Sequence, residues 1–249
     1  MEDRKRAVGA VIHFAQLLDV KNRGCRHMFC LKNVLLFVMI FVASDWLSAW
    51  GVDLPQHTRN SGQGKVIVFF GDSLTAGFGL DRAQAFPALI QEKIKERGWN
   101  FQVVNAGVSG ETTAGGLRRV EWILQRPIDV FVLALGGNDG LRGLPVEQAK
   151  QNLQAIIDRV RDKYPSARIV LAGMRIPPNL GRAYVTQFRE MFPELAKKNR
   201  VTLIPFLLEG VGGVPSLNLP DGIHPAPAGQ KIVAENVWKV LESVLEEAQ

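Results

Sequence analysis

Ser73 lies in a segment whose residue types are suited to nucleophilic chemistry. The apolar run at residues 65–70 stops at Gly71, and Asp72, Ser73 and Leu74 follow directly. A serine hydroxyl attacks a carbonyl group when a base removes its proton and a carboxylate orients that base. The glycines and hydroxyl groups of residues 71–79 are also compatible with a loop that binds phosphate. The segment alone therefore predicts either a nucleophile or a phosphate site.

The base that the sequence offers to Ser73 is His224. His57, the other histidine after residue 51, lies ahead of the first predicted strand. Asp221 precedes His224 by three residues, so one tight turn can carry both side chains on the same side. Pro225 disfavours helical backbone angles at His224 and keeps it on a loop. We predict that Asp221 orients the imidazole toward Ser73, although singly Asp221 also fits a turn former and His224 a surface residue.

An oxyanion hole is predicted from three hydrogen-bond donors, which are the N–H groups of Ser73 and Gly110 and the side-chain amide of Asn138. Asn138 follows the apolar run at residues 129–135 and is flanked by glycines, and Gly110 has no side chain to block an approaching substrate. The same residues also fit simpler structures, a tight turn around Asn138 and a helix capped by Thr112.

Asp72 and Asp139 stand beside these candidates, and we predict that both brace loops or cap helices rather than take part in the reaction. Cys25 and Cys30 both precede residue 34. A metal site is not expected, because one usable histidine without cysteines cannot build a typical zinc centre.

Alternating apolar runs and amphipathic stretches must position these residues. Five such strand–helix units predict a three-layer α/β/α sandwich around a mostly parallel five-stranded sheet, with ligands at the carboxyl ends of the strands. The strands are predicted at residues 65–70, 101–107, 129–135, 167–173 and 201–206, and the helices near 83–97, 113–125, 146–163, 184–198 and 227–247.

Composition argues against a nucleic-acid partner. The chain has 249 residues, 47% hydrophobic and 22% charged, with a formal net charge of +6. Much of this positive charge lies before residue 52, and the rest of the chain shows no basic stripe of the kind that binds nucleic acid.

The first 51 residues have the pattern of an export signal. Residues 34–43, VLLFVMIFVA, follow basic residues and are too few to span a bilayer as a helix. Small residues at 44–51 suit cleavage by a signal peptidase, and Met28 is an alternative start. The predicted organisation is a signal region at 1–51, a linker at 52–64 and one domain at 65–249. An uncleaved anchor or a buried helix is the other interpretation of the apolar run.

Four blocks of this sequence resemble those that define the SGNH (GDSL) hydrolases. The strings LGGNDGLRG and RIPPNLGRAY are similar to the branch that contains acyl-CoA thioesterase I, arylesterase and lysophospholipase. The four blocks are Gly71-Asp72-Ser73-Leu74, Gly110 within NAGVSGET, Asn138 within LGGNDGLRG, and His224 within DGIHP.

The resemblance implies a flavodoxin-like sheet and hydrolysis of acyl esters or thioesters through an acyl-serine intermediate, without a cofactor. It implies Ser73 as nucleophile, His224 as base and Asp221 as its partner. Thr75 replaces the second glycine of a G-x-S-x-G elbow, which argues against the standard α/β-hydrolase fold.

The loops after the third and fourth strands should flank the acyl chain of the substrate. The apolar side chains that we expect to contact this chain are Leu141, Leu144, Ile176 and Leu180. The predicted partner is a small acyl ester or a lipid, and the exported protein is expected to be a monomer without a stable membrane span. The alternatives are an exported carbohydrate-ester deacetylase and a non-catalytic flavodoxin-like module that binds a nucleotide, flavin or sugar.

Overall fold

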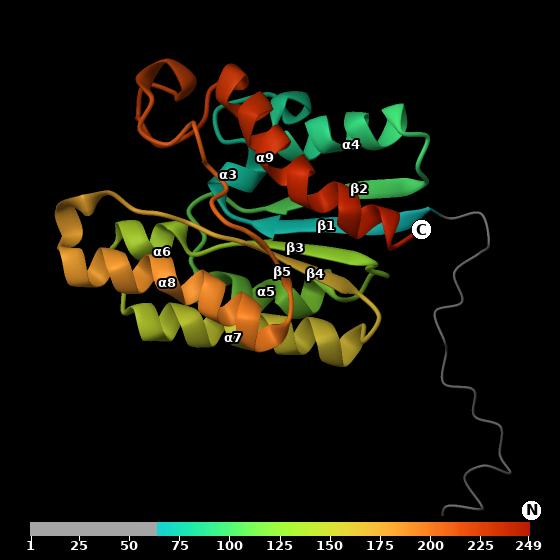
Figure 1. Ribbon diagram of the computed structural model, residues 1–249, viewed down its shortest axis with the longest axis horizontal. Coiled ribbons are helices and arrows are strands. Elements are labelled where there is room, and N and C mark those ends of the chain that lie inside the picture. The colour runs from blue at the N-terminus through green and yellow to red at the C-terminus, as the bar shows by residue number, and fades with distance from the viewer. Residues whose placement is uncertain (1–63) are drawn as a thin grey trace, which may run out of the picture. The chain divides into compact units, whose positions relative to one another are not determined.

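Five strands, all paired in parallel, form the central sheet of the computed structural model, which describes residues 64–249 (Figure 1). Their order, β2-β1-β3-β4-β5, is the flavodoxin-like order that the resemblance implies. The proposed signal region and nearly all of the proposed linker lie outside the described residues. The strands are β1 (Lys65–Gly71), β2 (Phe101–Gly107), β3 (Val130–Ala134), β4 (Arg168–Ala172) and β5 (Thr202–Ile204).

The predicted strands are confirmed, with one clear difference in length. Strand β3 is buried along its whole length, as expected for a parallel strand covered on both faces. Strand β5 has only three residues, whereas the sequence predicted six. Pro205 follows it directly and has no N–H to donate to a neighbouring strand, which accounts for the early end.

Helices cover both faces of the sheet and complete the predicted three layers. Figure 1 shows α4 (Phe86–Glu96) and α9 (Pro227–Glu246) on one face. It shows α5 (Thr113–Ile123), α7 (Val146–Lys163) and α8 (Arg182–Asn199) on the other. The apolar side chains of α7, among them Ala149, Leu153, Ile156, Ile157 and Val160, are buried, so this amphipathic helix packs on the core through them. No helix among residues 64–249 is long and apolar enough to cross a membrane.

Several short helical segments, which the sequence did not predict, lie in the loops. Helix α3 (Ser73–Ala76) follows β1, and α6 (Gly137–Leu141) follows β3. Single turns of 3-10 helix occur at η1 (Arg82–Gln84), η2 (Pro178–Leu180) and η3 (Pro215–Leu217). Helices α3 and α6, which contain residues of the SGNH blocks, lie at the carboxyl ends of β1 and β3 (Figure 1).

Two glycines allow α3 to approach the ends of β1 and β2 closely. A Cβ on Gly71 would lie 2.0 Å from Thr75 Oγ1, and a Cβ on Gly107 would lie 2.3 Å from the backbone nitrogen of Ala76. Helix α3 therefore packs against the ends of β1 and β2 so closely that no other residue fits either position. This packing explains why the apolar run of β1 ends in glycine just before Ser73.

Candidate active site

Ser73 is the first residue of α3 and is nearly buried. Asp72 caps the helix, since its Oδ1 accepts a hydrogen bond from the N–H of Leu74 at 3.0 Å. This contact agrees with the expectation that Asp72 braces a loop or caps a helix, although the sequence did not predict α3 itself. The cap fixes the backbone beside Ser73 and so fixes the position from which the hydroxyl projects.

His224 and Asp221 lie on one turn of the long loop between β5 and α9. His224 Nε2 is 2.9 Å from Ser73 Oγ, and His224 Nδ1 is 2.7 Å from Asp221 Oδ2. The other carboxylate oxygen, Oδ1, accepts the N–H groups of Ile223 at 2.9 Å and His224 at 3.0 Å. The structure therefore brings together the three residues that the sequence singled out, across 151 positions between Ser73 and His224.

These hydrogen bonds hold Asp221 in its charged form. The backbone N–H of His224, the imidazole of His224 and the N–H of Ile223 lower the pKa of Asp221 to about 2. A charged carboxylate only accepts hydrogen bonds, so Nδ1 carries the ring hydrogen and Nε2 is left to accept the proton of Ser73. This is the tautomer that a general base for Ser73 requires.

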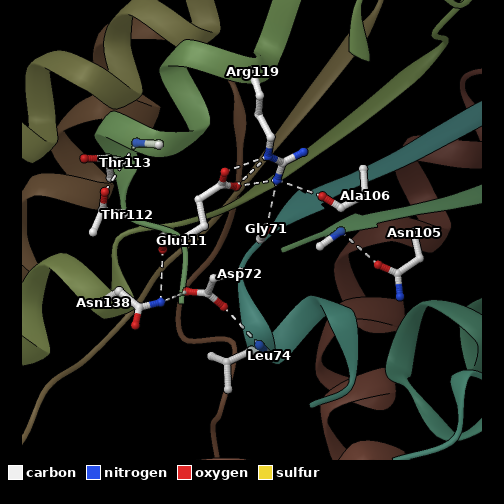
Figure 2. Close-up of polar contacts among 12 residues, drawn as sticks. Gly71, Asp72, Leu74, Asn105, Ala106, Glu111, Thr112, Thr113, Arg119 and Asn138 are labelled. Carbon is white, nitrogen blue, oxygen red and sulfur yellow. Dashed lines mark hydrogen bonds and ion pairs between the residues drawn. The ribbon is translucent and has the colours of Figure 1, made fainter. Parts of the chain in front are cut away.

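Asn138 belongs to α6 and contacts the loops that carry the other two candidate donors (Figure 2). Its Nδ2 lies 3.0 Å from the carbonyl oxygen of Glu111 and 3.3 Å from Asp72 Oδ2. Gly110, next to Glu111, has a φ of +77°, which favours glycine. The structure thus places the amide of Asn138 against the neighbours of both Ser73 and Gly110.

Asp72 is a second carboxylate of this site, and its surroundings differ from those of Asp221. Its side chain is almost completely buried, and this burial raises the pKa of Asp72 to about 6. The N–H of Leu74, His224 and the amide of Asn138 oppose the shift, whereas the charge of Glu111 adds to it.

Asp139 has the structural role that the sequence predicted. Its two carboxylate oxygens accept the backbone N–H of Thr113 at 2.8 Å and the hydroxyl of Thr113 at 2.6 Å. The hydroxyl also accepts a hydrogen bond from Asn152 at 3.0 Å. This buried cluster ties α6 to the start of α5, which Thr112 caps through its side chain. Among residues 64–249, no group of three or more histidine, cysteine and acidic side chains is arranged to hold a metal ion.

The four apolar residues expected at the acyl chain fall into two classes. Leu141, Leu144 and Leu180 are partly exposed on the loops after β3 and β4. Ile176 is 8% exposed and packs against α6, where a Cβ on Gly140 would lie 2.5 Å from it. The three leucines are open to a substrate, whereas Ile176 supports the helix beneath them.

Four further residues of this region were missed by sequence reasoning. The ring centroids of Phe78 and His224 are 4.5 Å apart. Arg142 donates a hydrogen bond to the carbonyl oxygen of Gly110 at 3.0 Å. Glu111 and Arg119 form an ion pair beside Asn138 (Figure 2). The only signal in the sequence was that Phe78, Glu111 and Arg142 lie in or next to the SGNH blocks.

This chain is similar to known proteins in both sequence and fold. Residues 69–232 match the model of the GDSL-like lipase/acylhydrolase family. Esterase TesA of Pseudomonas aeruginosa is 42% identical over 183 residues, which are 73% of this chain and 90% of that protein. Thioesterase 1/protease 1/lysophospholipase L1 of Escherichia coli is 38% identical over 180 residues, which are 72% and 84% of the two chains.

A solved structure agrees with the sequence comparisons. The crystal structure of TesA superposes with a TM-score of 0.69 at 40% identity, covering 72% of this chain and 99% of that one. The family match spans β1 to α9 and so includes all four sequence blocks. The chain therefore belongs to the GDSL-like lipase/acylhydrolase family and is an ester hydrolase.

Proposed function

We propose that the protein hydrolyses acyl esters and thioesters through an acyl intermediate on Ser73. The observation that carries the proposal is the hydrogen-bonded line from Ser73 Oγ through the imidazole of His224 to the carboxylate of Asp221, with contacts of 2.9 and 2.7 Å. In this line the hydroxyl meets a nitrogen that is free to accept its proton. The same contacts explain why a serine stands just after the end of β1.

The reaction begins when His224 Nε2 takes the proton of Ser73 as Oγ attacks the acyl carbon. The charge that forms on the acyl oxygen is stabilised by the N–H groups of Ser73 and Gly110 and by Nδ2 of Asn138. His224 then gives its proton to the leaving alcohol or thiol, and water repeats the cycle on the acyl-enzyme. Asp221 stays charged throughout and stabilises the imidazolium.

Asn138 must exchange one hydrogen bond to act in this step. Its Nδ2 carries two hydrogens, which point to Glu111 O at 3.0 Å and Asp72 Oδ2 at 3.3 Å. The oxyanion takes the place of the longer contact, to Asp72, while the contact to Glu111 holds the amide in position.

The proposed acyl chain lies against Leu141, Leu144 and Leu180, with Ile176 packed behind α6. This arrangement favours acyl esters with an apolar chain over carbohydrate acetyl esters, because three partly exposed leucines gain from burial against a hydrocarbon chain. The relatives named for esterase and for thioesterase and lysophospholipase activities support the same substrate class.

The test is hydrolysis of p-nitrophenyl esters from acetyl to decanoyl, with and without the nucleophile. We expect the wild type to be active and Ser73→Ala to fall to background while keeping its thermal unfolding temperature. Ser243→Ala, on α9 away from the site, is the matched control and should keep full activity. Equal rates in wild type and Ser73→Ala would contradict the proposal, and activity confined to acetyl groups on sugars would favour the deacetylase.

We also propose that the protein is exported, to the periplasm or the medium. The support is the sequence of residues 1–51, with its basic start, short apolar run and small residues at 44–51. N-terminal sequencing of the exported protein should find a first residue between 45 and 52. Recovery of the uncut chain from the cytosol alone would contradict export.

A further inference from the structure

Arg119, on α5, joins the ends of two strands to the loop that carries Gly110 (Figure 2). Its Nη2 donates to the carbonyl oxygens of Gly71 at 3.1 Å and Ala106 at 2.8 Å. Gly71 is the last residue of β1, and Ala106 is the last but one of β2. Its Nε lies 2.7 Å from both carboxylate oxygens of Glu111. The guanidinium also lies over the ring of Phe70, 4.0 Å from the centroid. One side chain therefore fixes three segments of the backbone.

Glu111 passes this constraint on to the proposed oxyanion donors. Its side chain is only 7% exposed, so the pair with Arg119 is shielded from solvent. Its backbone carbonyl accepts the hydrogen bond from Asn138, and its peptide bond follows Gly110. A shift of Glu111 thus moves the amide of Asn138 and the N–H of Gly110 together.

We propose that Arg119 and Glu111 are positioning residues that hold the oxyanion donors Gly110 and Asn138 in place for the reaction at Ser73. This inference rests on the function proposed above. Neither side chain touches the substrate. Their effect is on transition-state stabilisation, which depends on donor geometry far more steeply than substrate binding does.

A buried ion pair that served folding alone would not affect transition-state stabilisation more than substrate binding. Breaking such a pair destabilises the protein because it leaves one charge buried without its partner. The catalytic role predicts an additional effect, a loss in kcat without a matching rise in KM. That split is the readout that separates positioning from stability.

The experiment uses two conservative variants, Arg119→Lys and Glu111→Gln. Lysine keeps the charge but lacks the planar fork that reaches several acceptors at once, and glutamine keeps the shape of glutamate without its charge. We expect kcat to fall about tenfold in Arg119→Lys and less in Glu111→Gln, with KM within about twofold of wild type. Affinity for an alkyl boronic acid, whose tetrahedral adduct on Ser73 occupies the oxyanion site, should fall in parallel with kcat.

Arg159→Met is the matched control. Arg159 also anchors α5, since its Nη1 donates to the carbonyl oxygen of Leu117 at 2.8 Å and its Nε pairs with Glu121 at 3.4 Å. Both partners belong to α5, away from the loops that carry Gly110 and Asn138. We expect this variant to lose thermal stability and keep kcat. All measurements are made well below each variant's unfolding temperature, and Glu111→Gln carries the test where Arg119→Lys does not fold.

Repeating Arg119→Lys in an Asn138→Ala background tests the route of the effect. If Arg119 acts through Asn138, its substitution costs a smaller factor once that amide is gone. An equal factor in both backgrounds, a rise in KM alone, or unchanged kcat and boronic-acid affinity would each overturn the inference. Equal inactivity of wild type and Ser73→Ala would instead overturn the proposed function itself.

Discussion

Asp72 and Asp221 flank the same serine and histidine, yet their environments push them in opposite directions. Asp72 is buried, and its pKa is raised to about 6 because the charged form loses its hydration. Asp221 is partly exposed, and its pKa is lowered to about 2 because the N–H of His224, its imidazole and the N–H of Ile223 all donate to it. Two residues of one type therefore titrate in different pH ranges within one site.

The difference teaches which carboxylate can orient the base. The carboxylate that contacts the imidazole of His224 is Asp221, 2.7 Å from Nδ1, and its lowered pKa keeps this partner charged when the imidazole gains a proton. Asp72 instead caps α3 and accepts a hydrogen bond from the side-chain amide of Asn138. Nearness to Ser73 therefore does not decide the role of an aspartate. Its hydrogen-bond donors and its exposure to solvent do.

Among the substitutions at these two aspartates, Asp221→Asn should lower the activity most. The amide can no longer select the tautomer of His224 that accepts the proton of Ser73, so we expect kcat to fall by about 10⁴-fold. Steady-state kinetics with a p-nitrophenyl ester measures this loss. A fall of less than tenfold in a folded variant would remove Asp221 from the mechanism.

Asn138→Ala tests the buried side of the site. Loss of one oxyanion donor should lower kcat by about 10²–10³-fold without unfolding the protein. Circular dichroism and the KM of the same ester serve as controls. Full activity would show that Asn138 is only a contact of Asp72 and Glu111.

Asp72→Asn sharpens the comparison through stability. The folded pKa of Asp72 lies above its unfolded value near 4, so the contribution of Asp72 to stability should rise as the pH falls from about 7 to 4. The difference in unfolding free energy between wild type and Asp72→Asn should change over that window by roughly 1–3 kcal/mol. Urea unfolding at pH 4.5, 6 and 7.5 measures it.

The difference in unfolding free energy between wild type and Asp221→Asn should stay nearly constant between pH 7 and 5, because both proteins contain Asp72. Asp221 has a lowered folded pKa, so its stabilising contribution is complete above about pH 4 and is lost only as the pH falls toward 2. Identical pH profiles for the two variants would contradict the opposite assignments of the two aspartates.

Phe78→Ala should have the smallest effect. The ring of Phe78 lies against the imidazole of His224, and removing it frees the base without changing its hydrogen bonds to Asp221. We expect kcat to fall a few-fold, in line with the modest energy of one aromatic contact. Phe78→Leu should recover most of the loss, and a drop of a hundredfold would mean that the ring contacts the substrate.

Sequence alone predicted the sheet and the candidate triad because both follow from local patterns. Apolar runs gave the strands, parallel pairing put their carboxyl ends at one edge, and the three-residue spacing of Asp221 and His224 put both on one turn. Helices α3 and α6 were not predicted, because four or five residues are too few to show a helical period in the sequence.

Other features depend on contacts that no local pattern encodes. Arg119 meets the carbonyl oxygen of Gly71, 48 positions away, through a route that exists only once β1, β2 and α5 have packed. The burial of Ile176 likewise results from the fit of its side chain against the glycine face of α6. Such contacts are set by the close packing of the interior, where small differences in shape decide which side chain faces solvent.

The turn that carries Asp221 and His224 has a consequence for how these two side chains move. It is closed on itself by a hydrogen bond from the N–H of Leu219 to the carbonyl oxygen of His224 at 2.7 Å, and its carboxylate holds the backbone that follows it. Asp221 and His224 therefore share one six-residue turn, so a displacement of this turn moves both side chains together. Their geometry relative to each other is set within the turn, and the 2.9 Å contact with Ser73 depends on where the turn sits against α3.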